Sequence, residues 1–212
     1  TQGNHGEDVK EYYYYLDATP SHSYVKMLYK YPQVAYPYAA LVRENERRGP
    51  HDPEFELIDA LREPLAEGRY FDVFVEYAKP SVDDVVSRIT VHNRGPEAAP
   101  IHIVPHVWFR NRWAWTPDAA RPTLEKADPR TIRLHDPDLG ERWWYVDAPR
   151  GATLLFTENE TNHERLFGTA TPTPYVKDGI HNYVVNGATE AVHPGDTRSE
   201  ERRVGKECPS PC

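Results

Sequence analysis

Acidic, amide and imidazole side chains gather near the start of the chain, where they could bind or cleave a polar ligand. They precede a run of four tyrosines and are Asn4, His5, Glu7, Asp8 and Glu11. Two carboxyls can act as general acid and base when their surroundings separate their pKa values. Glu7 and Asp8 are adjacent in sequence, so on a strand they would point to opposite faces. The pattern therefore favours a solvated loop or ligand-binding hydrogen bonds over catalysis.

A second candidate cluster is the sequence WFRNRWAW at 108–115. Its candidate ligand-binding residues are Arg110, Asn111, Trp113 and Trp115. Aromatic faces and forked guanidinium donors suit sugar rings or planar anions. Trp108 and Phe109 continue a strand, and we expect Trp108 to enter the core. Trp113 and Trp115 lie in a loop. The sequence allows each of them either to pack in the core or to be exposed for ligand binding.

A third cluster, FTENETNHE, follows an apolar strand. Its candidate binding residues are Glu158, Asn159, Glu160 and Asn162. Such groups could bind a hard cation or sugar hydroxyls. The spacing does not match a calcium loop, and the ten His include no H-E-x-x-H pair. We therefore predict a substrate-binding role, with no catalytic residue, metal site or cofactor in this chain.

Composition restricts the class of partner. The 212 residues carry a formal charge of −8, which argues against a nucleic-acid partner. No run of about 18 apolar residues is present, so no membrane partner is expected. Cysteine occurs only at 208 and 212, so residues 1–197 contain neither a disulfide nor a thiolate site. This absence favours a cytoplasmic location.

The last fifteen residues, RSEERRVGKECPSPC, differ in composition from the rest of the chain. They contain both cysteines and no aromatic residue. The first eleven resemble the translation of a sequencing adapter, a contaminant of assembled genes. The alternative is a genuine charged tail. In either case we predict that 198–212 is non-native or disordered.

Alternating apolar and polar residues predict a mainly β protein, an antiparallel β-sandwich that forms one domain over 1–197. The expected strands are 11–17, 71–77, 85–93, 101–109, 130–135, 142–147, 152–158 and 181–186. Two short helices, at 21–32 and 37–49, are expected as an insertion near the N-terminus. The twenty prolines against twelve glycines fit many turns and strand ends.

Several blocks of the chain resemble one enzyme family. They include GNHGEDVKEYYYYLDATPSHSYVKMLYKYPQ, RYFDVFVEYAK, ITVHNRGPE, WFRN, LFTENETN, ERLFG and PYVKDGIHNYVVNG. In this order, from about Gln2 to about Pro194, they resemble the N-terminal region of bacterial glucosidases. Those enzymes are similar to mannosyl-oligosaccharide glucosidase, glycoside hydrolase family 63. The resemblance implies an N-terminal β-sandwich followed by a C-terminal (α/α) barrel that carries the inverting acid and base.

The expected function is therefore the non-catalytic sandwich portion of a glycosidase, truncated at both ends. Its intact form would hydrolyse terminal α-glucosidic bonds of an oligosaccharide substrate bound through the barrel. An apolar patch for docking the barrel is also expected. One alternative is a freestanding carbohydrate-binding module with Trp113 and Trp115 exposed in one plane. Another is a small hydrolase that uses the cluster at 4–11.

Overall fold

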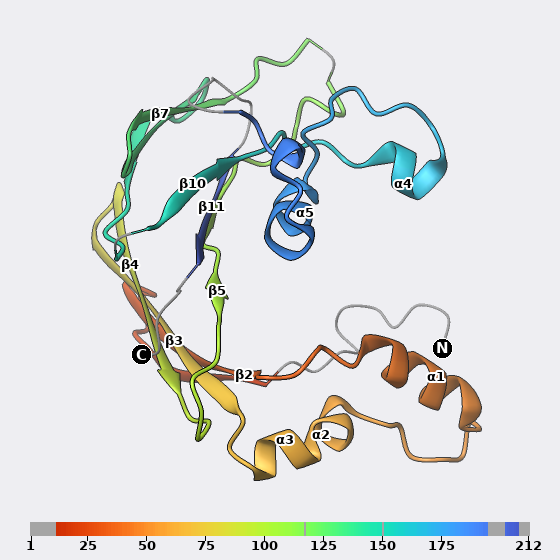
Figure 1. Ribbon diagram of the computed structural model, residues 1–212. Helices are drawn as coiled ribbons and strands as arrows, with labels where there is room; N and C mark the ends of the chain where they lie inside the picture. The colour runs from red at the N-terminus through yellow and green to blue at the C-terminus, as the bar shows by residue number, and fades with distance from the viewer. Residues whose placement is uncertain (1–11, 117, 150, 195–201, 208–212) are drawn as a thin grey trace. The chain divides into compact units, whose positions relative to one another are not determined.

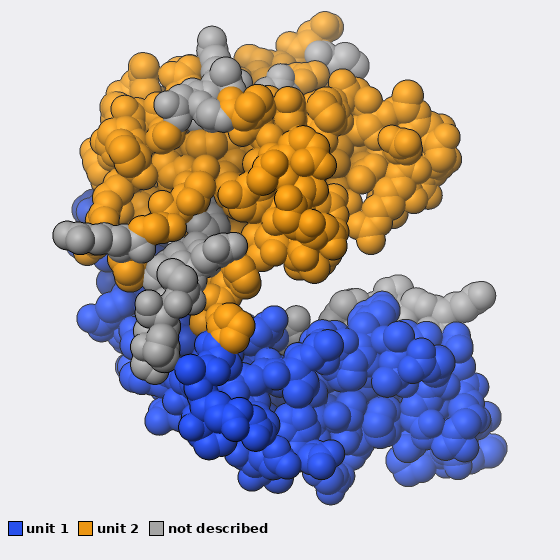
Figure 2. All heavy atoms as spheres, viewed as in Figure 1, with its two compact units in different colours: residues 1–99, 211–212 blue, residues 100–210 orange. Residues whose placement is uncertain are grey.

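The computed structural model describes residues 12–116, 118–149, 151–194 and 202–207. The chain divides into two compact units, residues 1–99 with 211–212 and residues 100–210 (Figure 2). Each unit is described by itself. Both are built on antiparallel sheets, so the predicted mainly β fold class is confirmed.

The first unit contains a four-stranded antiparallel sheet (Figure 1). Its strands are β1 (Tyr13–Ala18), β2 (Tyr24–Pro32), β3 (Tyr70–Ser81) and β4 (Asp84–Asn93). They pair in chain order, β1-β2-β3-β4. The expected strands at 11–17, 71–77 and 85–93 are thus present. The expected helix at 21–32 is wrong, because nine residues of this segment pair with β3 as strand β2. Its three tyrosines and one valine suit a pleated sheet better than a helix.

The register separates an aromatic face of this sheet from a face that carries charged residues. Val73 of β3 lies between Tyr29 and Val91, while the next residue towards the N-terminus, Asp72, lies between Lys30 and His92. Because neighbouring residues on a strand point to opposite faces, Lys30 and Asp72 lie on the face opposite Tyr29 and Val73, together with Leu28 and Phe74. The aromatic face contains Tyr13, Tyr15, Met27, Tyr29, Tyr31, Phe71, Val73, Val75, Tyr77, Ile89 and Val91.

A helical insertion connects β2 to β3. It contains α1 (Tyr38–Arg47), α2 (Leu57–Ala60) and α3 (Arg62–Ala66). Leu41, Leu57 and Leu61 form its small buried core. The insertion leaves and returns at one place, since the Gln33 amide donates to the Arg69 carbonyl at 2.9 Å. The helix expected at 37–49 is confirmed as α1, which begins directly after Pro37.

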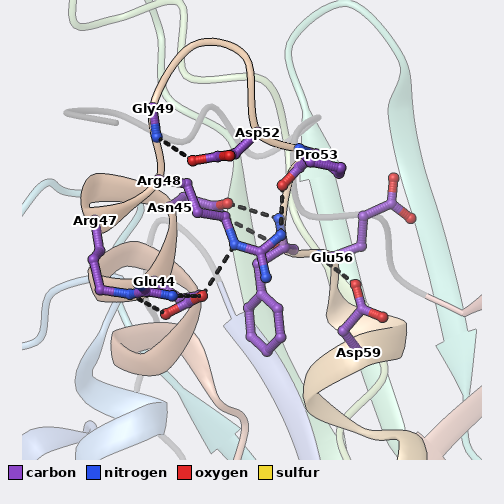
Figure 3. A network of polar contacts seen from close by, with 10 residues as sticks. Glu44, Asn45, Arg47, Arg48, Gly49, Asp52, Pro53, Glu56 and Asp59 are labelled. Atoms are coloured by element: carbon purple, nitrogen blue, oxygen red, sulfur yellow. Dashed lines mark hydrogen bonds and ion pairs between the residues drawn. The ribbon is translucent and has the colours of Figure 1, made fainter.

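Polar contacts hold the two sides of this insertion together (Figure 3). The Asn45 side chain donates to the Phe55 carbonyl at 3.0 Å and accepts from the Phe55 amide at 2.8 Å. Arg47 and Arg48 both donate to Glu44, and hydrogen bonds from these two arginines lower the Glu44 pKa to about 2. The Arg48 guanidinium also lies 5.2 Å from the centre of the Phe55 ring. The contacts are local, and they join the end of α1 to the start of α2.

The second unit contains two further antiparallel sheets. One consists of β7 (Thr123–Asp128), β8 (Thr131–Asp136) and β9 (Gly140–Tyr145). The other has the order β10-β11-β5, with β6 also paired to β11. These strands are β5 (His102–Ile103), β6 (His106–Val107), β10 (Thr153–Phe156) and β11 (Arg202–Glu207). The unit also contains α4 (His163–Phe167), α5 (Gly179–Asn186) and the 3₁₀ turn η2 (Thr189–Ala191).

These two sheets share a hydrophobic core. Leu124, Ile132 and Leu134 of one sheet pack with Phe156 of the other, and all four side chains are buried. The opposite side of β10 presents Leu155, which packs with Ile180 of α5 and with Val192. The sheet that contains β10 is therefore covered on both faces. Two packed antiparallel sheets are the kind of architecture that the sequence predicts, although here they belong to the second unit alone.

Two segments of the second unit differ from expectation. Residues 181–186 belong to helix α5, not to a strand; apolar residues 180, 183 and 184 recur at helical spacing, and Gly187 ends the helix in the left-handed conformation. Arg202–Glu207, within the segment predicted to be disordered, forms strand β11 between β10 and β5. Main-chain pairing of this kind is available to any sequence without proline. The predicted boundary at residue 197 stays a prediction, because 195–201 lie outside the described part.

Candidate functional site

The first predicted cluster, Asn4, His5, Glu7, Asp8 and Glu11, lies outside the described residues. Its role stays a prediction. The other two clusters both belong to the second unit. The structure brings them together.

Two asparagines join the predicted clusters by reciprocal hydrogen bonds. The Asn111 side chain donates to the Asn159 carbonyl at 2.8 Å, and the Asn159 side chain donates to the Phe109 carbonyl at 2.9 Å. Asn111 also accepts from the Ala114 amide at 3.0 Å. Asn159 is buried, so it brings the two loops together instead of facing a ligand.

The two loop tryptophans have opposite environments. Trp113 is only 5% exposed, whereas Trp115 is 70% exposed. The Arg110 guanidinium lies 5.4 Å from the centre of the Trp115 ring, a cation–π contact. The expectation that Trp113 and Trp115 share one exposed plane is therefore wrong. Apolar burial draws one ring inward and leaves the other at the surface.

An exposed stripe runs along the extended segment before this loop. His106, Trp108 and Arg110 alternate with Val107 and Phe109, which pack against the sandwich core. Because alternate residues of an extended chain face opposite sides, Trp108 remains 58% exposed. The expectation that Trp108 enters the core is thus wrong, and Phe109 takes that place. The His106 and Trp108 rings meet edge to face, with centres 6.3 Å apart. We call His106, Trp108, Arg110 and Trp115 the aromatic stripe.

Glu158 belongs to a polar contact that the sequence did not indicate. Its Oε1 lies 2.6 Å from Nε2 of His193, and both side chains are largely buried. The Tyr175 ring lies against the His193 ring, with centres 4.0 Å apart. The three residues are well separated along the chain, so no spacing rule could have found them. Their contacts join the segment after β10 to the segment after η2.

Asn162 and Asp178 form a second polar contact. Asn162 accepts from the Arg165 amide at 3.0 Å, which caps the start of α4, and donates to the Asp178 carboxylate at 3.2 Å. The Arg165 guanidinium lies 2.9 Å from the same carboxylate. Burial alone would raise the pKa of Asp178, but the hydrogen bonds from Arg165 and Asn162 outweigh it and lower that pKa. Asp178 is therefore an ionised acceptor at neutral pH. Glu160 contributes its carbonyl to the Lys177 amide at 3.0 Å.

A hollow of about 460 Å³ lies between α5 and the β5–β6 segment. Its lining combines four apolar and four polar side chains, which are Val104, Ile180, Val184, Val185, His106, Lys177, Asp178 and His181. His106 belongs both to this hollow and to the aromatic stripe. The candidate functional site consists of the hollow and the aromatic stripe, which share His106. It could bind a ligand that has both apolar and hydrogen-bonding faces.

Two absences within the described residues bear on the site. These residues contain no group of three or more His, Cys, Asp or Glu placed to hold a metal ion. Among the helices in the described ranges, none has the length and apolar character needed to cross a membrane.

The chain is similar to a protein of Saccharomyces cerevisiae, the uncharacterized protein YMR196W. The two are 40% identical over 225 aligned residues, which cover 91% of this chain and 21% of the yeast protein. The chain thus spans about a fifth of that relative's length. No known family profile matches the chain. No solved structure matches it either.

Proposed function

We propose that this chain is the non-catalytic β-sandwich portion of a larger glycoside hydrolase. The intact enzyme hydrolyses terminal α-glucosidic bonds of oligosaccharides with inversion. The sequence resemblance over most of the chain supports this proposal, and an antiparallel sandwich is the fold that the resemblance implies. The greater length of the yeast relative is consistent with a separate catalytic domain.

One observation supports a non-catalytic role. Within the described ranges, the carboxylates of Asp72, Glu76 and Asp178 form ion pairs with lysine or arginine side chains. An inverting glycosidase needs a protonated acid with a raised pKa, facing a base carboxylate about 6.5–9.5 Å away. Glu76, Asp72 and Asp178 show the opposite tendency. Hydrogen bonds from Arg88 and then Tyr24 lower the pKa of Glu76 to about 2. The pKa values of Asp72 and Asp178 are also lowered.

The aromatic face of the first unit's sheet also supports a role within a larger protein. Tyr13, Tyr31 and Tyr77 are each more than 40% exposed, and Tyr15 is 76% exposed. Exposed apolar patches with polar edges commonly pack against another domain. The tyrosine hydroxyls suit a surface that is partly wet and partly apolar.

The aromatic stripe favours a second candidate function, a freestanding carbohydrate-binding module. Exposed Trp108 and Trp115 offer ring faces, and Arg110 offers forked donors. This function predicts sugar binding by the chain without any larger partner. The two candidate functions differ in one respect: only the glycoside hydrolase proposal expects the longer yeast protein to cleave α-glucosides.

Hydrolysis assays separate these candidates. The 212-residue chain and the full-length yeast protein would each be incubated with an aryl α-glucoside and with maltotriose. We expect the yeast protein to release glucose, with the anomer followed by NMR to test inversion, and the chain alone to release none. Failure of the yeast protein to cleave either substrate would overturn the glycosidase proposal. Turnover by the chain alone that is abolished in Glu7→Gln would instead identify a small hydrolase.

A further inference from the structure

We propose that the hollow beside α5, together with Trp108, is a binding site for one or two sugar units of a neutral oligosaccharide. The inference rests on the proposed function for the choice of α-linked glucose units. Three features support the site itself: the lining of the hollow, the charges in that lining and the adjoining Trp108.

The lining matches the two kinds of surface that a sugar ring presents. Val104, Ile180 and Val184 provide an apolar wall for the C–H face of a ring. His181 is exposed on the same helix and can hydrogen-bond to hydroxyls. The volume of about 460 Å³ lies within the range of ordinary small-molecule sites.

The charges of the lining argue for a neutral ligand. Asp178 is ionised and its charge is compensated by Arg165, so the lining carries no uncompensated negative charge at this position. Lys177 lies in the same lining, so a bound cation would meet a positive one. Both groups can exchange hydrogen bonds with sugar hydroxyls, since a carboxylate accepts and an ammonium donates.

Trp108 extends the hollow in one direction. His106 lines the hollow, and its ring meets the Trp108 ring edge to face at 6.3 Å. The exposed Trp108 ring therefore lies within reach of a second sugar whose neighbour occupies the hollow. Its backbone is anchored, because Val107 and Phe109 on either side pack into the sandwich core. A tryptophan side chain has only two rotatable bonds, so its ordering on binding costs little entropy.

Calorimetric titration of the full 212-residue chain with maltotriose tests this site. We expect saturable binding at millimolar sugar, with the dissociation constant raised at least about fivefold in both Trp108→Ala and His181→Ala. The matched control is Trp143→Ala, because Trp143 is 45% exposed on β9, in the sheet that does not line the hollow. It should leave binding unchanged. Circular dichroism of each variant checks that the fold is retained.

The inference is overturned if maltotriose gives no saturable binding, or if binding survives both substitutions. It is also overturned if inorganic phosphate binds and competes with maltotriose, since the hollow would then prefer an anion. The experiments distinguish failure of the sugar-site inference from failure of the proposed glycosidase function. Cleavage of maltotriose by the yeast protein without binding by this chain would refute the sugar site alone. Binding here without cleavage there would refute the glycosidase alone.

Discussion

Substitution of Asp72 by asparagine should destabilise the first unit's sheet. Asp72 is 6% exposed near the start of β3. Its carboxylate lies 2.8 Å from Lys30 Nζ on β2 and 2.7 Å from Arg94 Nε just beyond β4. One side chain thus joins three consecutive segments of the meander. An asparagine at this position would keep the shape of the side chain and remove its charge.

The magnitude follows from the exposure of the two cations. Removing one partner of a fully buried ion pair costs about 3–5 kcal/mol, because the remaining charge is left without compensation. Here the Lys30 and Arg94 side chains keep 27% and 48% of their exposure, so water compensates part of that loss. We therefore expect Asp72→Asn to lower the free energy of unfolding by about 2 kcal/mol.

The effect should depend on pH in a defined direction. Burial alone would raise the pKa of Asp72, but hydrogen bonds from Lys30 and Arg94 outweigh it, and the pKa lies below its ordinary value of 3.8. A carboxyl with a lowered folded-state pKa stabilises the fold above its unfolded pKa and loses that contribution as pH falls through the folded value. The difference between wild type and Asp72→Asn should therefore be complete near neutral pH. It should shrink on acidification below 3.8.

Urea denaturation measures the total loss, and hydrogen exchange of β2 and β3 amides assigns it to this sheet. The matched control is Asp84→Asn, since Asp84 is an exposed residue at the start of β4. Similar losses in the two variants would refute the reasoning. So would a difference that persists unchanged in acid.

Three other substitutions test the second unit. Gly179→Ala should impair folding of α5, because a Cβ at this position would lie only 2.2 Å from the Ala191 carbonyl oxygen; thermal denaturation measures the loss. Asn159→Ala should cost about 1–3 kcal/mol in urea denaturation, because the Phe109 carbonyl loses its donor. Trp113→Phe should cost less than about 3 kcal/mol in the same assay, because removing the buried Nε1, which has no hydrogen-bond partner among the described residues, offsets part of the lost packing. A loss above about 3 kcal/mol, the range for deleting a large core side chain, would contradict that expectation.

Strands with clear alternation could be predicted from sequence alone, whereas β2 could not. In β3 the apolar residues recur at every second position, and this pattern is the main signal for a half-buried strand. The segment that forms β2 carries Ser21 and Ser23 before it and Pro32 at its end, which also suits a helix. Pairing with β3 over nine positions decides between the two structures. That pairing is a tertiary interaction that local propensity does not contain.

Only part of the candidate site could be predicted from the sequence: Arg110 and Trp115 belong to a predicted cluster, whereas the hollow-lining residues Lys177, Asp178 and His181 do not. The clusters around Arg110 and Asn159 were recognised because polar and aromatic residues concentrate there. Their contact depends on hydrogen bonds between residues 48 and 50 positions apart, which no motif encodes. His193 reaches Glu158 across 35 residues and was missed for the same reason. The sequence does not decide whether Trp108 or Phe109 faces the core. The two bulky aromatic residues are adjacent, and only one of them can face inward.

The helical insertion between β2 and β3 begins and ends at paired positions, with Pro32 opposite Tyr70. The sheet therefore has the connectivity of a simple hairpin at this point, whatever the intervening chain contains. The entropy of closing such an excursion changes by only about 0.6 kcal/mol for each doubling of its length. This junction is consequently where the polypeptide can gain or lose whole segments during evolution, or accept a grafted peptide, while the strand order stays the same.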